Sequence, residues 1–459
     1  MREIVSDLPR SESPPMSSRF PVVVLVMVFL IGFKGVSTHA DDEWPQFRGP
    51  DGQGHATAIG LPIRWSETEN IAWKTALPGE GHSSPVISGD QVWVTTAITR
   101  ELTAEEEKER LAKLANPQGL KLAGELTLQA IQLDRESGKI VRTVDLFQVS
   151  HPEPKHGLNS YASPTPVIAG NKLFCHFGSY GTACVDRTSG EVLWRNDSVR
   201  VDHQNGPGSS PVFSNDSLII HFDGTDRQFI AALNPLDGQI LWETKRSGEM
   251  DARPDLKKAY GTPLVIATDA GPQIISPAAN WVYGYDARDG KELWKVGYGQ
   301  LGFSTVPRPV VMDNTVFIAT SYMQSRLIAV KLGGTGDVTA THTAWKSDRQ
   351  IPNKPSLIAL QDRLYFVSDK GIARCVNAQT GEDVWFERLG GDYSASPIAA
   401  EGHLYFCNQE GICTVIETGD AYKELAQNTL DAGCMASPAV AGKALYLRTA
   451  THLYRVEEK

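Results

Sequence analysis

One segment that recurs along the chain constrains its fold more than any other feature. Its clearest copy, residues 163–194, reads SPTPVIAGNKLFCHFGSYGTACVDRTSGEVLW. Four short runs rich in Val, Ile, Phe and Leu alternate with turn sequences that contain Gly, Asn and Ser, which predicts four antiparallel strands. So small a sheet cannot bury both of its faces alone, whereas copies stacked around an axis bury each other. We therefore expect an all-β propeller.

The number of repeats follows from the start of each innermost strand, where a small residue or a base precedes Pro and an apolar run. Eight such starts occur: Ser84-Pro85, Ser163-Pro164, Ser210-Pro211, Thr262-Pro263, Arg308-Pro309, Lys354-Pro355, Ser396-Pro397 and Ser437-Pro438. The prolines are 41 to 52 residues apart, except for a first interval of 79. Four-stranded blades have periods of about 40 to 50 residues, so the chain is expected to form eight blades.

A second motif marks the turn before the outermost strand of a blade. It consists of Asp or Asn, three residues, Gly, three residues and Trp. The copies are Asp186, Gly190 and Trp194; Asn234, Gly238 and Trp242; Asp286, Gly290 and Trp294; and Asn377, Gly381 and Trp385. The Asx side chain accepts a backbone hydrogen bond and Gly supplies a positive φ, so the turn is chemically specified. Each Trp is expected to pack against the neighbouring blade.

The two ends of the chain complement each other. The last repeat, residues 437–456, has only three strands, and residues 71–77, which include Trp73, resemble a fourth strand without a blade. An N-terminal strand that completes the C-terminal blade closes the ring and leaves no open sheet edge. The expected domains are therefore an irregular strap at 41–70 and a propeller at 71–459, with a charged helical insertion at about 99–127.

The N-terminus predicts export. Basic residues precede an apolar run at 21–33, and Thr38-His39-Ala40 provides small residues for cleavage near Ala40, so residues 1–40 are interpreted as a signal peptide. A retained anchor is the alternative, although the run is shorter than the ~20 residues of a membrane span. The mature chain is thus expected in the periplasm, the cell envelope or the extracellular space. The net charge of -10 of the full sequence argues against a nucleic-acid partner, and we expect a monomer.

Export gives a meaning to the six cysteines, because disulfides persist in oxidising compartments. Cys175 and Cys184 lie symmetrically about one expected hairpin turn, and Cys407 and Cys413 about another. Each pair is expected to meet across its hairpin, either as a disulfide or as two buried thiols packed side by side.

These motifs, the Ser-Pro-Val strand start and the early Trp44-Pro45-Gln46-Phe47-Arg48-Gly49-Pro50 resemble the pyrroloquinoline-quinone-like (PQQ-like) repeat family over residues 44–457. The resemblance implies an eight-bladed propeller like that of quinoprotein alcohol dehydrogenases. The family contains dehydrogenases that bind PQQ and calcium, and non-catalytic members such as a component of the outer-membrane assembly machinery. The dehydrogenases carry two adjacent cysteines near the quinone, and this sequence has none. The chain is therefore interpreted as a secreted non-catalytic member without a cofactor.

Ligands of propellers usually bind beside the central channel, on the face that carries the links from one blade to the next. The candidate ligand-binding residues in these links are His82, His156, Asn159, Tyr161, His203, Asn205, Tyr260, Arg308, Lys354 and Tyr393. Convergent His, Asn and Tyr side chains suit a polar ligand, but no spacing among them fixes a metal geometry. Arg308 and Lys354 stand where other repeats have Ser or Thr, and they are expected either to bind an anion or to pair with nearby acids.

The sequence thus predicts an exported binding or scaffolding propeller with no chemistry of its own, which presents its channel-mouth loops to an envelope protein or a small polar ligand. It contains no nucleophile elbow, zinc-protease motif, phosphate loop or dinucleotide fingerprint. Two alternatives stay open. One is a PQQ-dependent dehydrogenase, and the other is a carbohydrate-active enzyme, whose paired carboxylates would come from separate blades and leave no local spacing.

Overall fold

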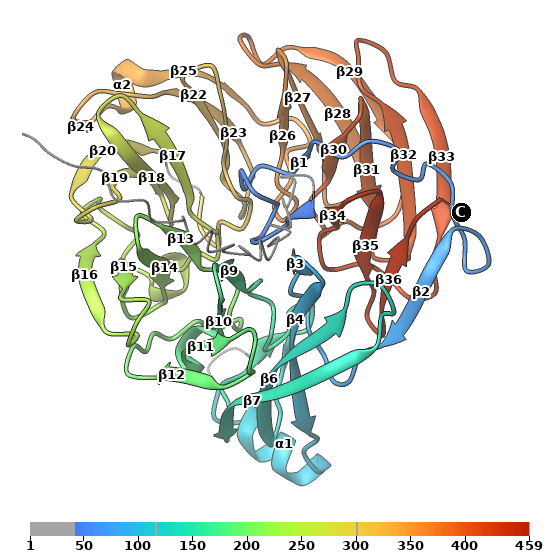
Figure 1. Cartoon of the computed structure of the whole chain (residues 1–459). Coiled ribbons are helices and arrows are strands. Elements are labelled where there is room, and N and C mark those ends of the chain that lie inside the picture. Colours follow the sequence, from blue (N-terminus) through green and yellow to red (C-terminus); the bar gives the residue numbers. More distant parts are fainter. Residues whose placement is uncertain (1–41, 115–116, 300–301, 459) are drawn as a thin grey trace, which may run out of the picture. The chain divides into compact units, whose positions relative to one another are not determined.

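Eight antiparallel sheets are arranged in a ring around an axis (Figure 1). The computed structural model describes residues 42–114, 117–299 and 302–458, which belong to one compact unit. The predicted all-β, eight-bladed propeller is confirmed. The predicted signal peptide lies outside the described residues, and no helix among those described is long and apolar enough to cross a membrane.

Each blade has four antiparallel strands, which are named below in their order from the axis outward. Blade 1 contains β3 (Val86–Ser88), β4 (Gln91–Arg100), β6 (Glu125–Asp134) and β7 (Ile140–Ser150). Blade 2 contains β9 (Val167–Ala169), β10 (Lys172–His176), β11 (Thr182–Asp186) and β12 (Val192–Asn196). Blade 3 contains β13 (Val212–Ser214), β14 (Ser217–Asp223), β15 (Gln228–Leu233) and β16 (Ile240–Lys245). Blade 4 contains β17 (Leu264–Thr268), β18 (Gly271–Pro277), β19 (Trp281–Asp286) and β20 (Glu292–Gly297).

The second half of the ring repeats this order. Blade 5 contains β21 (Val310–Met312), β22 (Thr315–Ala319), β23 (Leu327–Lys331) and β25 (Thr343–Ser347). Blade 6 contains β26 (Ile358–Leu360), β27 (Arg363–Val367), β28 (Ile372–Asn377) and β29 (Asp383–Arg388). Blade 7 contains β30 (Ile398–Ala400), β31 (His403–Cys407), β32 (Ile412–Glu417) and β33 (Glu424–Thr429). Blade 8 contains β34 (Ala439–Ala441), β35 (Ala444–Arg448), β36 (His452–Val456) and β2 (Ile71–Ala76).

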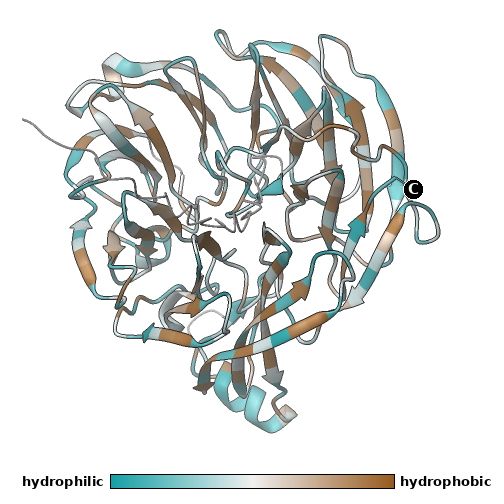
Figure 2. Ribbon diagram, in the orientation of Figure 1, coloured by the Kyte–Doolittle hydropathy of each residue, from teal (hydrophilic) through white to brown (hydrophobic). Residues whose placement is uncertain are grey.

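The N-terminal strand β2 closes the ring. It pairs antiparallel with β36, with Thr75 opposite Leu453, and becomes the outermost strand of blade 8. The predicted closure is therefore confirmed. Hydrophobic residues line the strands of every blade (Figure 2), and each core cluster fills the space between neighbouring sheets, as where Phe317 of blade 5 and Leu364 of blade 6 share one cluster. Closure provides such a partner for both faces of every sheet.

The outer-strand tryptophans hold one blade to the next. Their indole N–H groups donate to carbonyl oxygens of the following blade, from Trp73 to Arg135, from Trp194 to Pro235, from Trp345 to Ala378 and from Trp385 to Gly419. The rings also cover the turn glycines, as Trp242 covers Gly290. Trp294 differs, because its ring lies beside Gly284 of its own blade and covers no turn glycine, although it shares a core cluster with Val316 of blade 5. Blade 5 has a longer turn, in which β24 (Gly336–Asp337) pairs with β20, so it offers Trp294 no glycine turn to cover.

The glycine beneath each indole gives a sharp prediction. Gly238 has a φ of +74° and a Cβ added to it would lie 2.5 Å from the Trp194 ring, whereas Gly170 has a φ of +55° with no atom within 4 Å of an added Cβ. Gly238→Ala is expected to lower the free energy of unfolding by about 3 kcal/mol, against about 1 kcal/mol for Gly170→Ala, because only the former adds a steric clash to the backbone strain. Urea unfolding of both variants measures the difference, and equal losses would contradict blade docking by Trp194.

Strand register decides which cysteines meet. Cys407 lies directly opposite Cys413, and the two form a disulfide. Cys175 lies opposite Ala183 while Cys184 lies opposite Phe174, so the two thiols point to opposite faces of the sheet. The predicted Cys175–Cys184 pairing is therefore wrong, and both cysteines are free and buried.

This arrangement predicts the thiol count of the purified protein. Alkylation after unfolding without reductant, followed by intact mass spectrometry, is expected to label four thiols and to leave one disulfide. Reduction before alkylation should expose two more thiols. A second disulfide, or six reactive thiols without reductant, would contradict the observed register.

Residues 42–70 form a strap across the ring, drawn in blue near the centre of Figure 1. Trp44 pairs with Ile87 of blade 1, and β1 (His55–Ala56) adds a parallel strand to β30 of blade 7. Trp65 then donates its backbone N–H to Asn428, also in blade 7. Since Trp44 and Trp65 are buried, the strap is part of the core.

Blade 1 carries an arm in the region predicted as a helical insertion. Helix α1 (Ala104–Leu111) begins at Thr103, whose side chain and that of Glu106 form a capping box. No α1 side chain is buried, and Figure 2 shows the helix as largely hydrophilic. The arm also contains β5 (Leu120–Lys121), which pairs with β8 (Lys155–His156) in the next link. The remaining elements are α2 (Thr339–His342) and the 3-10 turns Gly178–Tyr180 and Pro254–Leu256.

Candidate functional site

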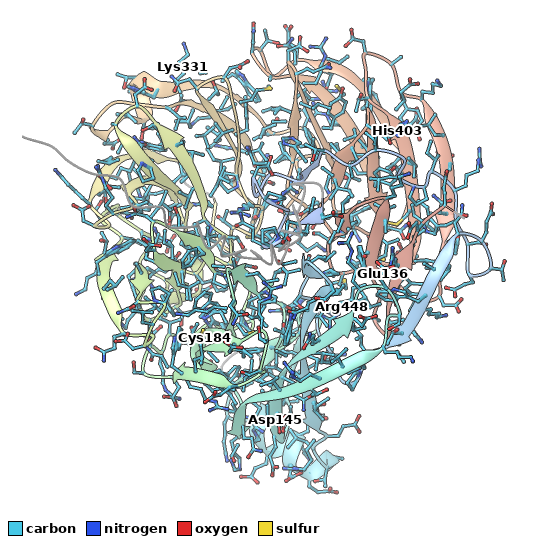
Figure 3. The ribbon with its side chains drawn as sticks, in the orientation of Figure 1. Glu136, Asp145, Cys184, Lys331, His403 and Arg448 are labelled. Atoms are coloured by element: carbon cyan, nitrogen blue, oxygen red, sulfur yellow. A yellow bond between two sulfur atoms is a disulfide. The ribbon has the colours of Figure 1, made fainter. Side chains whose placement is uncertain are left out.

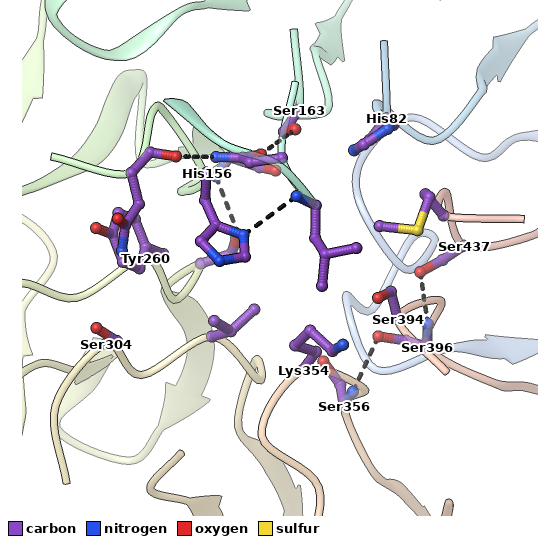
Figure 4. Close-up of a pocket in the computed structure, with 18 of the residues that line it drawn as sticks. His82, His156, Ser163, Tyr260, Ser304, Lys354, Ser356, Ser394, Ser396 and Ser437 are labelled. Carbon is purple, nitrogen blue, oxygen red and sulfur yellow. Dashed lines mark hydrogen bonds between the residues drawn. The ribbon is translucent and has the colours of Figure 1, made fainter. Parts of the chain in front are cut away.

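A cavity of about 410 Å³ lies at the axis, on the side of the ring that carries the links between blades (Figure 4). All eight links contribute side chains to it, and Phe47 of the strap contributes one more. Six of the predicted residues line this cavity: His82, His156, Asn159, Asn205, Tyr260 and Lys354. Residues that are far apart in the sequence therefore converge, as the propeller geometry requires.

The other four predicted residues do not line the cavity. Tyr161 is 1% exposed and its hydroxyl donates to the Glu153 carbonyl, while Tyr393 is fully buried among residues of blades 6 and 7. His203 is also buried, and its ring lies against Gly178. Their assignment to the cavity wall is wrong, because a link has two sides and these side chains point into the core.

Arg308 is the fourth predicted residue that does not line the cavity. Its guanidinium is buried and donates to the carbonyl oxygens of Pro263 and Phe47, the latter in the strap. The strap is hydrogen-bonded to inner strands beyond their first residues, at Ile87, Ile168 and Val311. Arg308 therefore points toward the strap and does not line the cavity.

Lys354 lies at the mouth but does not replace a Ser. Ser356 occupies the position equivalent to Ser396 and Ser437 of the next two blades, and in blade 2 that position belongs to Thr165 and not to Ser163. The Lys354 ammonium lies 3.5 Å from the Asp369 carboxylate. The expected pairing with a nearby acid is thus observed for Lys354.

The cavity floor is a set of hydroxyls that the sequence reasoning did not single out. We define the hydroxyl ring as Ser84, Thr165, Ser210, Thr262, Ser356, Ser396 and Ser437. Each side-chain oxygen accepts the backbone N–H of the equivalent residue in the preceding blade, at 2.9 to 3.1 Å. Arg308 provides the donor at the eighth position. The Ser or Thr that recurs before Pro is the sequence signal for the hydroxyl ring, and it marks a hydrogen bond between neighbouring blades.

The cavity carries positive charge. No Asp or Glu lines it, whereas Lys258 and Lys354 both do. The ammonium of Lys258 is held by the Gln204 side chain at 2.5 Å and the Asp255 carbonyl at 2.6 Å, and burial lowers its pKa. Desolvation, aided by Arg448 and Lys155, lowers the pKa of His82 to about 3. His82 is therefore a neutral donor and acceptor at neutral pH.

His156 lies in the same electrostatic environment. Desolvation, followed by the charges of Lys354 and Lys155, lowers its pKa. Within the described ranges, no group of three or more His, Cys, Asp or Glu side chains is placed to hold a metal ion. The wall instead combines hydroxyls, ammonium groups and neutral imidazoles with the rings of Phe303 and Tyr322, which suits a ligand that accepts hydrogen bonds.

Comparison with solved structures agrees with this fold. BamB from Moraxella catarrhalis has a TM-score of 0.54 at 14% identity, with 84% of this chain and 99% of that chain covered. A europium-containing methanol dehydrogenase has a TM-score of 0.61 at 11% identity, with 89% of each chain covered. At such identities the likeness concerns the fold alone.

Comparison of sequences gives distant relatives. Tetrathionate hydrolase of Acidithiobacillus ferrooxidans is 25% identical over 263 residues, which cover 53% of this chain and 49% of that protein. The chain thus spans about half the length of that relative. The outer membrane protein assembly factor BamB of Yersinia pestis is 21% identical over 338 residues, which cover 63% of this chain and 82% of that protein.

The decisive match is to a family. Residues 111–269 and 226–459 match the family model described as outer membrane protein assembly factor BamB. Together the two matches span residues 111–459, which is more than half of the chain. The chain therefore belongs to the PQQ-like propeller family of the outer membrane protein assembly factor BamB.

Proposed function

We propose that this chain is an exported binding propeller that holds a small molecule in its axial cavity, presents the surrounding links to an envelope protein, and performs no reaction of its own. The observation that carries the proposal is the cavity itself, to which all eight links contribute. Membership of a family described as an assembly factor supports the scaffolding part.

The chemistry of the wall favours binding over the two enzymatic alternatives. Calcium takes carboxylate oxygens as ligands, and glycosidases use a pair of carboxylic acids. None of the residues that line the cavity is an Asp or Glu, and the sequence has no adjacent cysteines for a quinone site. The residues present therefore do not fit a resident PQQ and calcium pair, and we propose that the chain works without them.

An apolar rim supports a protein partner. Leu158 and Tyr322 line the cavity and are 50% and 37% exposed, and the neighbouring Met323 is 78% exposed. Exposed apolar side chains gathered beside a polar site are typical of interaction surfaces. An envelope protein that docks on this rim would cover the mouth of the cavity and hold the ligand between the two proteins.

A variant that fills the cavity tests the proposal. Val306 lines the cavity, whereas Val141 lies on outer strand β7 and is 56% exposed. Small molecules released from the purified protein by denaturation are identified by mass spectrometry, and their rebinding is measured by calorimetry. Val306→Trp is expected to abolish rebinding while Val141→Trp preserves it. Equal binding by both variants would place the ligand elsewhere.

The dehydrogenase alternative has its own measurement. Purified protein is incubated with PQQ and calcium chloride, and quinone uptake is followed by absorption together with dye-linked turnover of alcohols and sugars. No turnover is expected. Stoichiometric uptake with turnover would overturn the assignment as a binding protein.

A further inference from the structure

We infer that the ligand of this cavity is a small dianion, one of whose anionic groups accepts hydrogen bonds from the hydroxyl ring. The inference rests on the proposed function, because it names the chemical class that the binding cavity takes. Three observations carry it: unused hydroxyl protons, buried cations without acidic partners, and the size of the cavity.

The hydroxyl ring is a converging set of donors. All seven side chains are at least 95% buried, and all line the same cavity. Each oxygen already accepts a backbone N–H, and none of the seven hydroxyls donates to another group among the hydrogen bonds of the described residues. A hydroxyl that accepts a bond still carries a proton to donate. The floor therefore offers O–H donors to whatever occupies the cavity.

Buried cations next to the ring select a negative ligand. Arg48, Arg308 and Arg448 are each at most 3% exposed. Arg448 donates to Ser83, next to Ser84, and Arg48 donates to the carbonyl of Leu357, next to Ser356. These guanidinium groups thus surround the ring at the level of its backbone. Burial lowers the pKa of each arginine to about 9, which reflects the cost of charge in this environment.

No acid neutralises these three arginines. In the described part of the chain none of them has a carboxylate within ion-pair distance. The charge of Asp51 raises the pKa of Arg48 and Arg308 without an ion pair to either. The ion-pair partner of its carboxylate is His55, at 2.7 Å. A buried charge without a partner is costly. An anion on the neighbouring ring would offset that cost, whereas a neutral ligand of the same shape would not.

The cavity has room for a second anionic group. Its volume of about 410 Å³ extends upward from the ring to Lys258 and Lys354, which come from two different links. The wall also includes the apolar side chains of Phe303, whose ring centroid lies 5.8 Å from the Lys258 ammonium, and Met435. The class is therefore a short molecule with an anionic group at each end, such as a polythionate or an aliphatic dicarboxylate. Tetrathionate, which the name of one relative contains, is a member of this class.

Calorimetry on the full chain tests the inference with tetrathionate, adipate and the neutral sugar trehalose as probes. At least one dianion is expected to bind at 1:1 with an affinity that falls as salt is raised, and trehalose is expected not to bind. Which dianion binds more tightly distinguishes the inorganic source from the organic one. Lys354→Met should weaken binding by about tenfold, the effect of one lost charged contact.

Lys331→Met is the matched control and should bind like the parent chain, because Lys331 is exposed at the end of β23, away from the centre of the ring (Figure 3). Thr262→Val tests the ring, and since it also removes the acceptor for Ser210, its unfolding midpoint is recorded alongside its affinity. The inference fails, while the proposed function stands, if neither dianion binds but trehalose does and Val306→Trp abolishes the binding of trehalose. If none of the three probes binds and no ligand is released by denaturation, both fail.

Discussion

Asp223→Ala is expected to lower the free energy of unfolding by about 3–5 kcal/mol, the cost of leaving a buried charge without its partner. Asp223 and Arg246 form a bidentate pair at 2.9 and 2.7 Å, and neither side chain is exposed. Arg246 also donates to Ser276, whose hydroxyl is bonded to His221. Removal of the carboxylate therefore leaves the Arg246 guanidinium unpaired inside a network that joins blades 3 and 4.

Urea unfolding of Asp223→Ala, Arg246→Met and the double variant Asp223→Leu with Arg246→Met separates charge from packing. The double variant should recover part of the loss, because it leaves no unpaired charge. A loss below about 1 kcal/mol for Asp223→Ala would mean that water reaches the site. Arg363→Met, which breaks the pairs of Arg363 with the exposed carboxylates of Asp362 and Asp420, is the control and should change stability by less than about 1 kcal/mol.

Lowering the pH from 7 to 5 is expected to remove about 6 kcal/mol of stability through three buried histidines, a loss to which His82 adds and which Glu153, whose burial raises its pKa to about 7, opposes. His176, His203 and His221 are buried. Burial lowers the pKa of His176 to about 3 and that of His203 to about 4, and it holds the pKa of His221 well below its usual value. Unfolded histidine titrates near 6.5, so between about pH 6.5 and 4 the unfolded chain binds more protons than the folded chain. Each histidine then contributes about 2 kcal/mol of destabilisation at pH 5.

The pH dependence of urea unfolding measures this effect. His203→Gln should flatten the slope of stability against pH between about 6.5 and 4, because it removes one of the three groups. His151→Gln is the matched control, since His151 is exposed, and its slope should equal that of the parent chain. A slope that does not change in His203→Gln would show that this imidazole is protonated as readily in the folded chain as in the unfolded chain.

The fold could be read from the sequence because the information is local and repeated. The turn motif specifies its own geometry, as where Asp186 accepts the backbone N–H groups of Thr188 and Ser189 beside a glycine of positive φ. Strand β2 could be assigned because its blade lacked one strand. Where repeats differ, as in the long turn of blade 5, the rule still gives the neighbour of Trp294, which shares a core cluster with blade 5, but not the turn glycine that the other tryptophans cover.

The site was only partly predictable, because its details depend on register and on side-chain direction. A shift of one residue separated Cys175 from Cys184, and a shift of two moved the ring position from Lys354 to Ser356. Tyr161 and His203 come from the correct links but face inward. The convergence of the remaining six residues was predictable, since it requires only that each link lies on one side of the ring.

Closure by β2 also sets the order in which the chain can acquire its structure. Blades 1 to 7 each form from consecutive residues, whereas Thr75 must find Leu453 near the other end of the chain. Closing a loop roughly eight times longer than one repeat costs about 2 kcal/mol more in chain entropy. Sheets formed from neighbouring residues therefore assemble first, and the seam of blade 8 joins last. Until then the edges of β36 and β2 are exposed, so a chain truncated at either end would present an open strand edge to other copies of itself.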